Sequence, residues 1–248
     1  VQGNPASDGI GMWPTKMSLS KDKSRLYALS HYQARIDVMD TAANNVIGHA
    51  SFNVTKPRTD TISTMAMDKS RNRLYAVWPE IGLVGIASAT TSSPYIVVVD
   101  SFNLSSFGFN VSSAANGGPG LVTLAVDETL GRLYVYLYNE QRLLAFDGQT
   151  LALASQASVA LKNKNEDSLV SNGEKGVLYL GAKTLNASTL AEKESFSKGS
   201  RVIAFDNSRG TVYLSEALTT APHVVNETIY EFIGGAQTAQ WSLDPVLS

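Results

Sequence analysis

The sequence of 248 residues contains no cysteine and only three histidines, His31, His49 and His223. Without cysteine, the chain has no disulfide, no thiolate nucleophile and no cysteine-ligated metal. The histidines form no His-Glu-x-x-His pair, and the sequence lacks a Gly-x-Ser-x-Gly elbow, a phosphate loop and an EF-hand loop. We therefore expect no local catalytic motif, no metal and no cofactor, which leaves only a site assembled from dispersed residues.

Strong charge of either sign and long apolar runs are also missing. Lys plus Arg number 20 and Asp plus Glu number 22, so the formal charge is −2. This balance, without a basic stripe, argues against nucleic acid or a polybasic membrane contact. The uncharged run Ile81 to Val99 is rich in Ser and Thr and contains Pro94, so it is too polar to span a membrane.

What the sequence does contain is a repeat centred on a tyrosine in an apolar, β-prone segment. Each tyrosine is followed or preceded by apolar residues, and a small polar residue that suits a turn lies seven positions before it. The anchors are Leu26-Tyr27, Leu74-Tyr75, Leu133-Tyr134, Leu178-Tyr179 and Val212-Tyr213, and the turn residues are Ser20, Asp68, Asp127, Asn172 and Asp206. The pattern predicts five β-hairpins.

A second pattern follows each hairpin in the more regular repeats. Ile36 to Asp40, Tyr95 to Asp100 and Leu143 to Asp147 each read as a strand that ends in Asp, and another strand follows after a short turn. A unit therefore has four antiparallel strands. Four strands with a period of roughly 40–50 residues predict an all-β chain folded as a β-propeller.

These residues resemble the repeats of the YVTN family of β-propellers. The matching segments are Asp68 with Arg73-Leu74-Tyr75-Ala76, Asp127 with Arg132-Leu133-Tyr134-Val135, and the strand ends Asp40-Thr41 and Asp147 to Thr150. The resemblance covers nearly the whole chain and implies a propeller of the lactonase-like or surface-antigen-like kind. It says little about activity, because propellers host many functions.

The expected organisation is one domain, residues 1–248, with five blades. Their approximate ranges are 14–54, 61–111, 121–161, 168–197 and 201–243. Blade 2 is expected to carry an insertion, Pro79 to Pro94, between its second and third strands, and blade 5 a second one, Glu216 to Thr228. Blade 4 reads as abbreviated. The alternative is a fragment of a six- or seven-bladed propeller, and the start at Val1 suggests a processed or trimmed chain.

The candidate binding residues lie on the loops expected between the second and third strands. Variable loops on a rigid scaffold commonly carry function, whereas the short turns between first and second strands are expected to be too uniform to form a pocket. An aromatic and polar mixture suits a sugar, a peptide or a small polar ligand. The candidates are His31, Tyr32, Trp78, Glu80, Tyr138, Glu140, Lys183, Glu216 and His223.

Two sets of repeated residues are interpreted as structural. Asp68, Asp127 and Asp206 each stand alone in a turn, whereas calcium needs six to eight oxygen ligands, so we expect them to bond the backbone. The tyrosine anchors are expected to pack the blades. His49 is expected to lie in a strand.

The leading hypothesis is a non-enzymatic extracytoplasmic propeller, secreted, periplasmic or on the cell surface, that binds a protein, a glycan or a small polar ligand at its channel face. One alternative is a lactonase-like hydrolase whose dispersed site would draw on Glu80, Glu140, Glu216 and His223. The other is a structural subunit of a larger extracellular assembly that offers its sheet edges to a neighbour.

Overall fold

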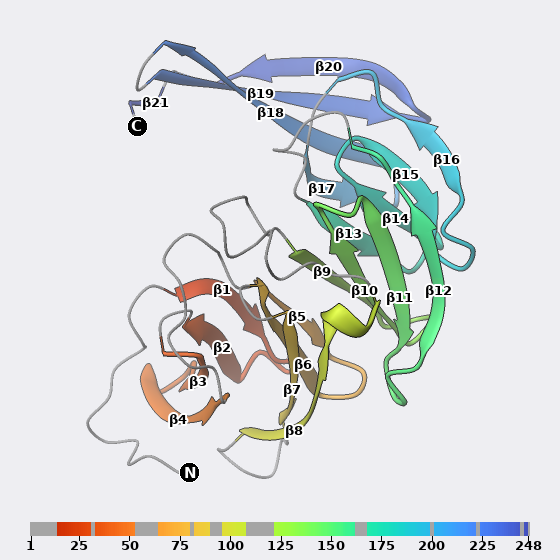
Figure 1. Cartoon of the computed structure of the whole chain (residues 1–248). Coiled ribbons are helices and arrows are strands. Elements are labelled where there is room, and N and C mark those ends of the chain that lie inside the picture. The colour runs from red at the N-terminus through yellow and green to blue at the C-terminus, as the bar shows by residue number, and fades with distance from the viewer. Residues whose placement is uncertain are drawn as a thin grey trace. The chain divides into compact units, whose positions relative to one another are not determined.

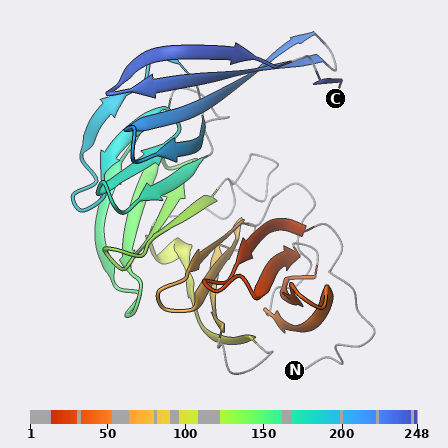
Figure 2. The same cartoon turned by 180° about the vertical axis from the view of Figure 1, so that it is seen from behind.

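The protein is described from a computed structural model, which covers residues 14–30, 33–52, 64–79, 82–89, 96–107, 122–161, 168–198, 201–221, 224–243 and 246–247. Most of these residues lie in strands, and η2 (Leu104–Phe107) is a short 3-10 helix. The expected all-β class is confirmed (Figures 1 and 2). No helix in the described part is long and apolar enough to cross a membrane.

The strands form five antiparallel sheets, which we call blades 1 to 5. The first compact unit of the chain, residues 1–128 with 137–140, holds blades 1 and 2 and the first strand of blade 3. Its strands are β1 (Pro14–Leu19), β2 (Arg25–Ser30), β3 (Arg35–Asp40), β4 (Asn45–Ser51), β5 (Thr64–Asp68), β6 (Arg73–Trp78), β7 (Leu83–Ala89), β8 (Ile96–Asn103) and β9 (Val122–Asp127). Blades 1 and 2 run in simple order, β1-β2-β3-β4 and β5-β6-β7-β8.

The second compact unit, residues 129–136 with 141–248, holds the rest of blade 3 and blades 4 and 5. Its strands are β10 (Arg132–Leu137), β11 (Arg142–Asp147), β12 (Leu153–Ser158), β13 (Leu169–Asn172), β14 (Val177–Leu180), β15 (Lys183–Asn186), β16 (Glu192–Ser195), β17 (Arg201–Asp206), β18 (Thr211–Ala221), β19 (Val224–Ile233), β20 (Ala236–Ser242) and β21 (Val246–Leu247). Strand order again follows the sequence, and β21 adds to β19.

Each blade has a register shift at one equivalent place, between its third and fourth strands. The extra residue of such a bulge locally increases the strand twist. The shifts fall between Val38 and Met39, Ile86 and Ala87, Ala145 and Phe146, Thr184 and Leu185, and Glu231 and Phe232. The residue after each shift is Asp40, Ser88, Asp147, Asn186 and Ile233 in blades 1 to 5, and in every blade except blade 2, where β7 continues to Ala89, it ends the third strand.

This alignment corrects three expectations about the weaker blades. In blade 2, the third strand is β7, inside the expected insertion, while Asp100 belongs to the fourth strand β8. Blade 4 is complete, because β15 and β16 supply its outer half with four residues each. In blade 5, the expected insertion is a paired extension of β18 and β19, in which Glu216 faces Thr228 across the ladder.

The core lies between neighbouring blades within each unit. Tyr27, Tyr75, Tyr134 and Tyr179 are all buried, as expected for packing residues, while Tyr213 is partly exposed. The apolar cluster between blades 4 and 5 includes Tyr179, Phe196, Leu214 and Phe232. Burial of large apolar side chains of this kind is the main source of stability.

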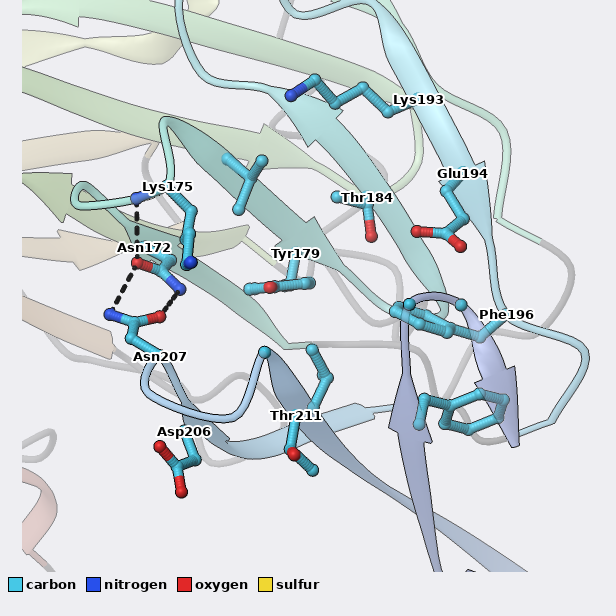
Figure 3. A pocket seen from close by; sticks show the side chains of 16 residues that line it. Asn172, Lys175, Tyr179, Thr184, Lys193, Glu194, Phe196, Asp206, Asn207 and Thr211 are labelled. Carbon is cyan, nitrogen blue, oxygen red and sulfur yellow. Dashed lines mark hydrogen bonds between the residues drawn. The ribbon is translucent and has the colours of Figure 1, made fainter. Parts of the chain in front are cut away.

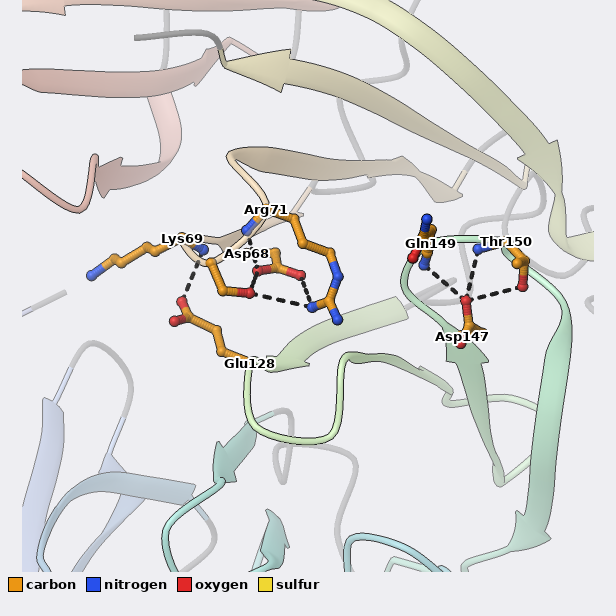
Figure 4. A network of polar contacts seen from close by, with 8 residues as sticks. Asp68, Lys69, Arg71, Glu128, Asp147, Gln149 and Thr150 are labelled. Carbon is orange, nitrogen blue, oxygen red and sulfur yellow. Dashed lines mark hydrogen bonds and ion pairs between the residues drawn. The ribbon is translucent and has the colours of Figure 1, made fainter.

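The turn residues also act as expected. The Asp68 carboxylate is buried and accepts bonds from the Arg71 amide and the Ser70 hydroxyl, and it forms a 2.8 Å ion pair with the Arg71 guanidinium (Figure 4). Asp206 accepts the Ser208 and Arg209 amides in the same way. These bonds satisfy backbone amides of the turns.

Candidate functional site

Four of the residues expected in a binding site, His31, Tyr32, Glu80 and His223, lie outside the described residues. The other five can be placed. None of the five lines either of the two pockets described below.

Trp78 does not lie on a loop, as the sequence suggested, but is the last residue of β6. Its side chain is fully buried in the cluster between blades 1 and 2. Its ring centroid lies 4.5 Å from that of Phe52, and Phe52 in turn occupies the space beside Gly85 that a Cβ atom would fill. The indole therefore serves as a core residue in this structure, and its role in ligand binding stays a prediction.

The remaining four candidates are dispersed. Tyr138 is buried and Glu140 is partly buried. Lys183 forms a 2.7 Å ion pair with Glu192, and this bond is the largest cause of the lowered pKa of the Glu192 carboxyl. Glu216 accepts a 3.1 Å hydrogen bond from the Tyr230 hydroxyl, whose pKa is raised by burial and then by this carboxylate.

The pocket of chemical interest lies instead between blades 4 and 5, at the turns that join their first and second strands (Figure 3). This corrects the expectation that these turns leave too little room. Each turn is short, but the turns of two neighbouring blades and the β19–β20 turn together enclose a cavity of about 300 Å³. That volume lies at the lower end of the range for small-ligand sites.

The floor of this pocket is apolar and aromatic. Val177, Tyr179, Phe196, Val212 and Phe232 line it, and all five belong to the core cluster between the two blades. Phe196 and Phe232 pack with ring centroids 4.8 Å apart. The pocket is therefore the open end of a packed core, which holds its aromatic surfaces in fixed positions.

One wall carries a pair of asparagine side chains from the two turns. The Asn172 amide donates to the Asn207 carbonyl at 2.6 Å, and the Asn207 amide donates back at 3.2 Å (Figure 3). The Asn207 amide also donates to Glu174 at 2.6 Å. Asn172 in turn bonds the Tyr179 hydroxyl, whose pKa is raised mainly by burial. The phenol therefore stays protonated at neutral pH and can donate a proton in a hydrogen bond.

Three side chains that lie side by side on blade 4 face blade 5. Tyr179, Thr184 and Glu194 are direct partners across β14, β15 and β16, so they share one face of the sheet. In Figure 3 the Thr184 hydroxyl points into the pocket, between Tyr179 and Glu194. Thr184 is 6% exposed, and its hydroxyl has no hydrogen-bond partner among the described residues.

Thr211 lies at the opposite edge of the pocket and offers an internal comparison. Its hydroxyl also lacks a partner among the residues that the structure covers, and the residue is 1% exposed. Its neighbour Val212 faces blade 4 in the core cluster, and strand side chains alternate between faces, so Thr211 points to the other side of blade 5. Figure 3 shows its hydroxyl directed away from Tyr179.

The rim combines both signs of charge. Lys175, Lys193, Glu194 and Asp206 line it. A bond from the Ser208 hydroxyl, followed by bonds from two turn amides, lowers the pKa of Asp206. The Glu194 carboxylate lies against Gly235, where a Cβ would overlap it, and Gly235 has a φ of +80° that favours glycine.

Sequence reasoning missed this site because it is formed by residues of two different turns. Asn172 and Asn207 are 35 positions apart, and nothing in either turn alone predicts their contact. One signal was present: Asn172 holds the turn position where three other repeats have Asp and one has Ser. An amide both donates and accepts, so it can form a reciprocal pair with a second amide, whereas an ionised carboxylate can only accept.

No family model matches the sequence, and no curated protein matches it. Solved structures do match. Dihydro-heme d1 dehydrogenase NirN in complex with DHE is similar to this chain with a TM-score of 0.62 at 13% identity, over 93% of this chain and 47% of that one. The chain of a mitotic checkpoint complex gives a TM-score of 0.61 at 10% identity, over 95% and 65%. The fold is a β-propeller.

A third match is the hydrazine synthase of Kuenenia stuttgartiensis, with a TM-score of 0.59 at 11% identity, over 94% of this chain and 68% of that one. The propeller thus spans about half to two thirds of the length of these structures. At such low identity the likeness concerns the fold alone, and one fold carries many functions. Any argument about function must therefore rest on the residues of the site.

Proposed function

We propose that this propeller is a non-enzymatic, extracytoplasmic module of the YVTN type that binds a small polyhydroxylated ligand, such as a sugar unit of a glycan, between blades 4 and 5. The single observation that carries the proposal is the Thr184 hydroxyl, which is buried, has no partner among the residues that the structure describes, and is directed into an aromatic-floored pocket. A buried hydroxyl without a partner is costly, so such a group calls for an explanation.

The rest of the pocket suits the two kinds of surface that a sugar ring presents. Its apolar C–H faces can lie on Tyr179, Phe196 and Phe232. Its hydroxyls both donate and accept, which matches the Asn172 and Asn207 amides and the Glu194 carboxylate. A mixture of an apolar floor with a few convergent polar groups is typical of small-molecule sites.

Support for the extracytoplasmic and YVTN-type parts of the proposal comes from the sequence. The repeated Asp, Arg-Leu-Tyr and closing Asp positions resemble that family. The structural alignment of the blades adds Asn186, which accepts the Ser188 and Thr189 amides just as Asp147 accepts those of Gln149 and Thr150. A secreted, periplasmic or cell-surface protein of this kind commonly meets glycans, which makes sugars the first ligands to test.

The experiment is a panel of neutral, acidic and amino sugars screened by thermal shift, followed by isothermal titration calorimetry of the hits. Wild type, Thr184→Val and Asn207→Ala are compared, with Thr211→Val as the matched control. We expect at least one sugar to bind wild type, and each pocket variant to weaken it by about two- to tenfold, as expected for one lost hydrogen bond. Thr211→Val should bind as wild type does.

Two results would overturn the proposal. One is the failure of every sugar to bind wild type. The other is a sugar that binds Thr184→Val and Asn207→Ala as tightly as wild type, because its site would then lie elsewhere. Turnover of a bound sugar would contradict the non-enzymatic part alone, and product analysis by mass spectrometry after overnight incubation checks it.

A further inference from the structure

A second cavity lies between the first turns of blades 1 and 2, in the other compact unit of the chain. It encloses about 390 Å³. One wall is the turn from Ser20 to Arg25, which joins β1 to β2, and the other is the turn from Lys69 to Asn72, which joins β5 to β6. It occupies the same place between its blades as the pocket between blades 4 and 5, but its chemistry is different.

Positive charge dominates the lining. Lys21 and Arg25 come from blade 1 and Lys69 comes from blade 2, against a single acidic residue, Asp22. Neither Lys21 nor Lys69 forms an ion pair within the described part of the chain. In Figure 4 the Lys69 side chain extends away from Glu128, which accepts its backbone amide at 2.9 Å.

The one carboxylate in the cavity is already bonded within its own turn. One Asp22 oxygen accepts the Ser20 hydroxyl at 2.6 Å and the Ser24 amide at 3.1 Å, and the other accepts the Ser24 hydroxyl at 2.9 Å. These bonds fix the turn that presents Lys21 and Arg25. They also direct Asp22 toward the serines, so it does not form an ion pair with either lysine.

The Asp68 and Glu128 carboxylates lie just outside the cavity and do not cancel this excess. Asp68 is buried and paired with Arg71 at 2.8 Å, so the two balance each other. Glu128 accepts the Lys69 amide at 2.9 Å, and its single negative charge is smaller than the excess of two positive charges in the lining. Arg25 bonds the hydroxyl of Tyr27, the aromatic residue of the lining, and this bond positions the guanidinium at the cavity.

We propose that this cavity is a second binding site, for a compact oxyanion such as a phosphate or sulfate group. Cations from two turns surround it, and charge-assisted hydrogen bonds from Lys and Arg are the strongest that a protein offers to such a group. The anion is either free in solution or carried by a larger molecule. This site does not depend on sugar binding between blades 4 and 5, because it lies in the other unit and uses different residues.

The test is an NMR titration of the ¹⁵N-labelled full chain at low ionic strength. The probes are inorganic phosphate, sulfate and glucose 6-phosphate, with glucose as the uncharged control. We expect the amide signals of Lys21, Ser24, Lys69 and Ser70 to shift with all three anions and not with glucose. Added sodium chloride should weaken the effect, because salt screens exposed charges.

Two matched double variants test whether the anion binds in this cavity. Lys21→Gln with Lys69→Gln should weaken anion binding by about tenfold or more, since two charged donors are lost. Lys16→Gln with Lys198→Gln removes the same charge from residues that do not line the cavity, and should bind as wild type does. Circular dichroism checks that both variants keep their β-structure.

The relative affinities distinguish a site for a free anion from a site for an anion carried by a larger molecule. Equal binding of the inorganic anions and the sugar phosphate supports a site for a free anion, and tighter binding of glucose 6-phosphate supports an anion carried on a larger ligand. Absence of shifts with every anion would overturn the proposal. So would equal weakening by the two double variants, because the effect would then be due to overall charge.

Discussion

The Thr184 hydroxyl offers a prediction in which stability and binding move in opposite directions. Thr184→Val replaces the hydroxyl by a methyl group and keeps the branched shape that a strand favours. In the ligand-free structure the hydroxyl is buried and has no partner in the described part of the chain. Leaving a buried polar group unsatisfied costs about 1–3 kcal/mol, so its removal relieves a penalty without creating a cavity.

The expected result is an unfolding free energy that is unchanged or higher by about 1 kcal/mol, which for a chain of this size raises the melting temperature by about 2–4 °C. Thermal and urea unfolding of the ligand-free protein measure it. The ligand, by contrast, loses one hydrogen bond, worth about 0.5–1.5 kcal/mol. A hydroxyl with a structural role would show a loss of stability instead.

Two control Thr→Val substitutions show what stability change to expect from a hydroxyl with and without a protein partner. Thr211→Val also removes a buried hydroxyl that has no partner among the described residues, so it should leave stability unchanged or raised, but it should not affect the ligand. Thr150→Val removes a hydroxyl that donates to Asp147 at 3.0 Å (Figure 4), so it should lower stability by about 0.5–1 kcal/mol. A loss of more than about 1 kcal/mol for Thr184→Val would refute the reasoning, because the hydroxyl would then have a protein partner.

Three further predictions concern the scaffold. Trp78→Ala should lower the unfolding free energy by about 3–5 kcal/mol in urea titrations, because the indole is fully buried; a loss below about 1 kcal/mol would contradict its place in the core. Asp68→Ala should cost about 1–3 kcal/mol, since it leaves the Arg71 amide and guanidinium without their buried acceptor, whereas Asp68→Asn, which retains one acceptor oxygen, should cost less. Bonds from Ser20 and then Ser24 lower the pKa of Asp22 from 3.8 to about 2, so its contribution to stability is present above about pH 4 and is lost as the pH falls toward 2. The stability difference between wild type and Asp22→Asn should therefore shrink on acidification, and a difference that grows would contradict this.

The fold could be read largely from the sequence because each blade repeats a local pattern. The tyrosine anchors and turn residues lie within one hairpin, and their spacing alone predicts five blades. The pattern failed where a single position differed. In blade 2, Ser88 occupies the position that Asp40 and Asp147 hold in blades 1 and 3, so the pattern matched Asp100 in the next strand.

The candidate site could not be predicted from local sequence patterns. One wall comes from Asn172 and Asn207, and the aromatic rings of its floor come from β14, from β19 and from the segment after β16. Contacts between blades depend on how two sheets pack, which no local pattern encodes. The search for aromatic residues likewise selected Trp78, whose burial depends on Phe52 and Gly85 around it.

The most direct test of the central claim is a crystal structure of the protein with the tightest-binding sugar of the screen. The account predicts density for the sugar between blades 4 and 5, with one ring face on Tyr179 and a sugar hydroxyl within hydrogen-bond distance of the Thr184 oxygen. A sugar bound instead at the loops between second and third strands would contradict it, and would return the site to the residues that the sequence alone suggested.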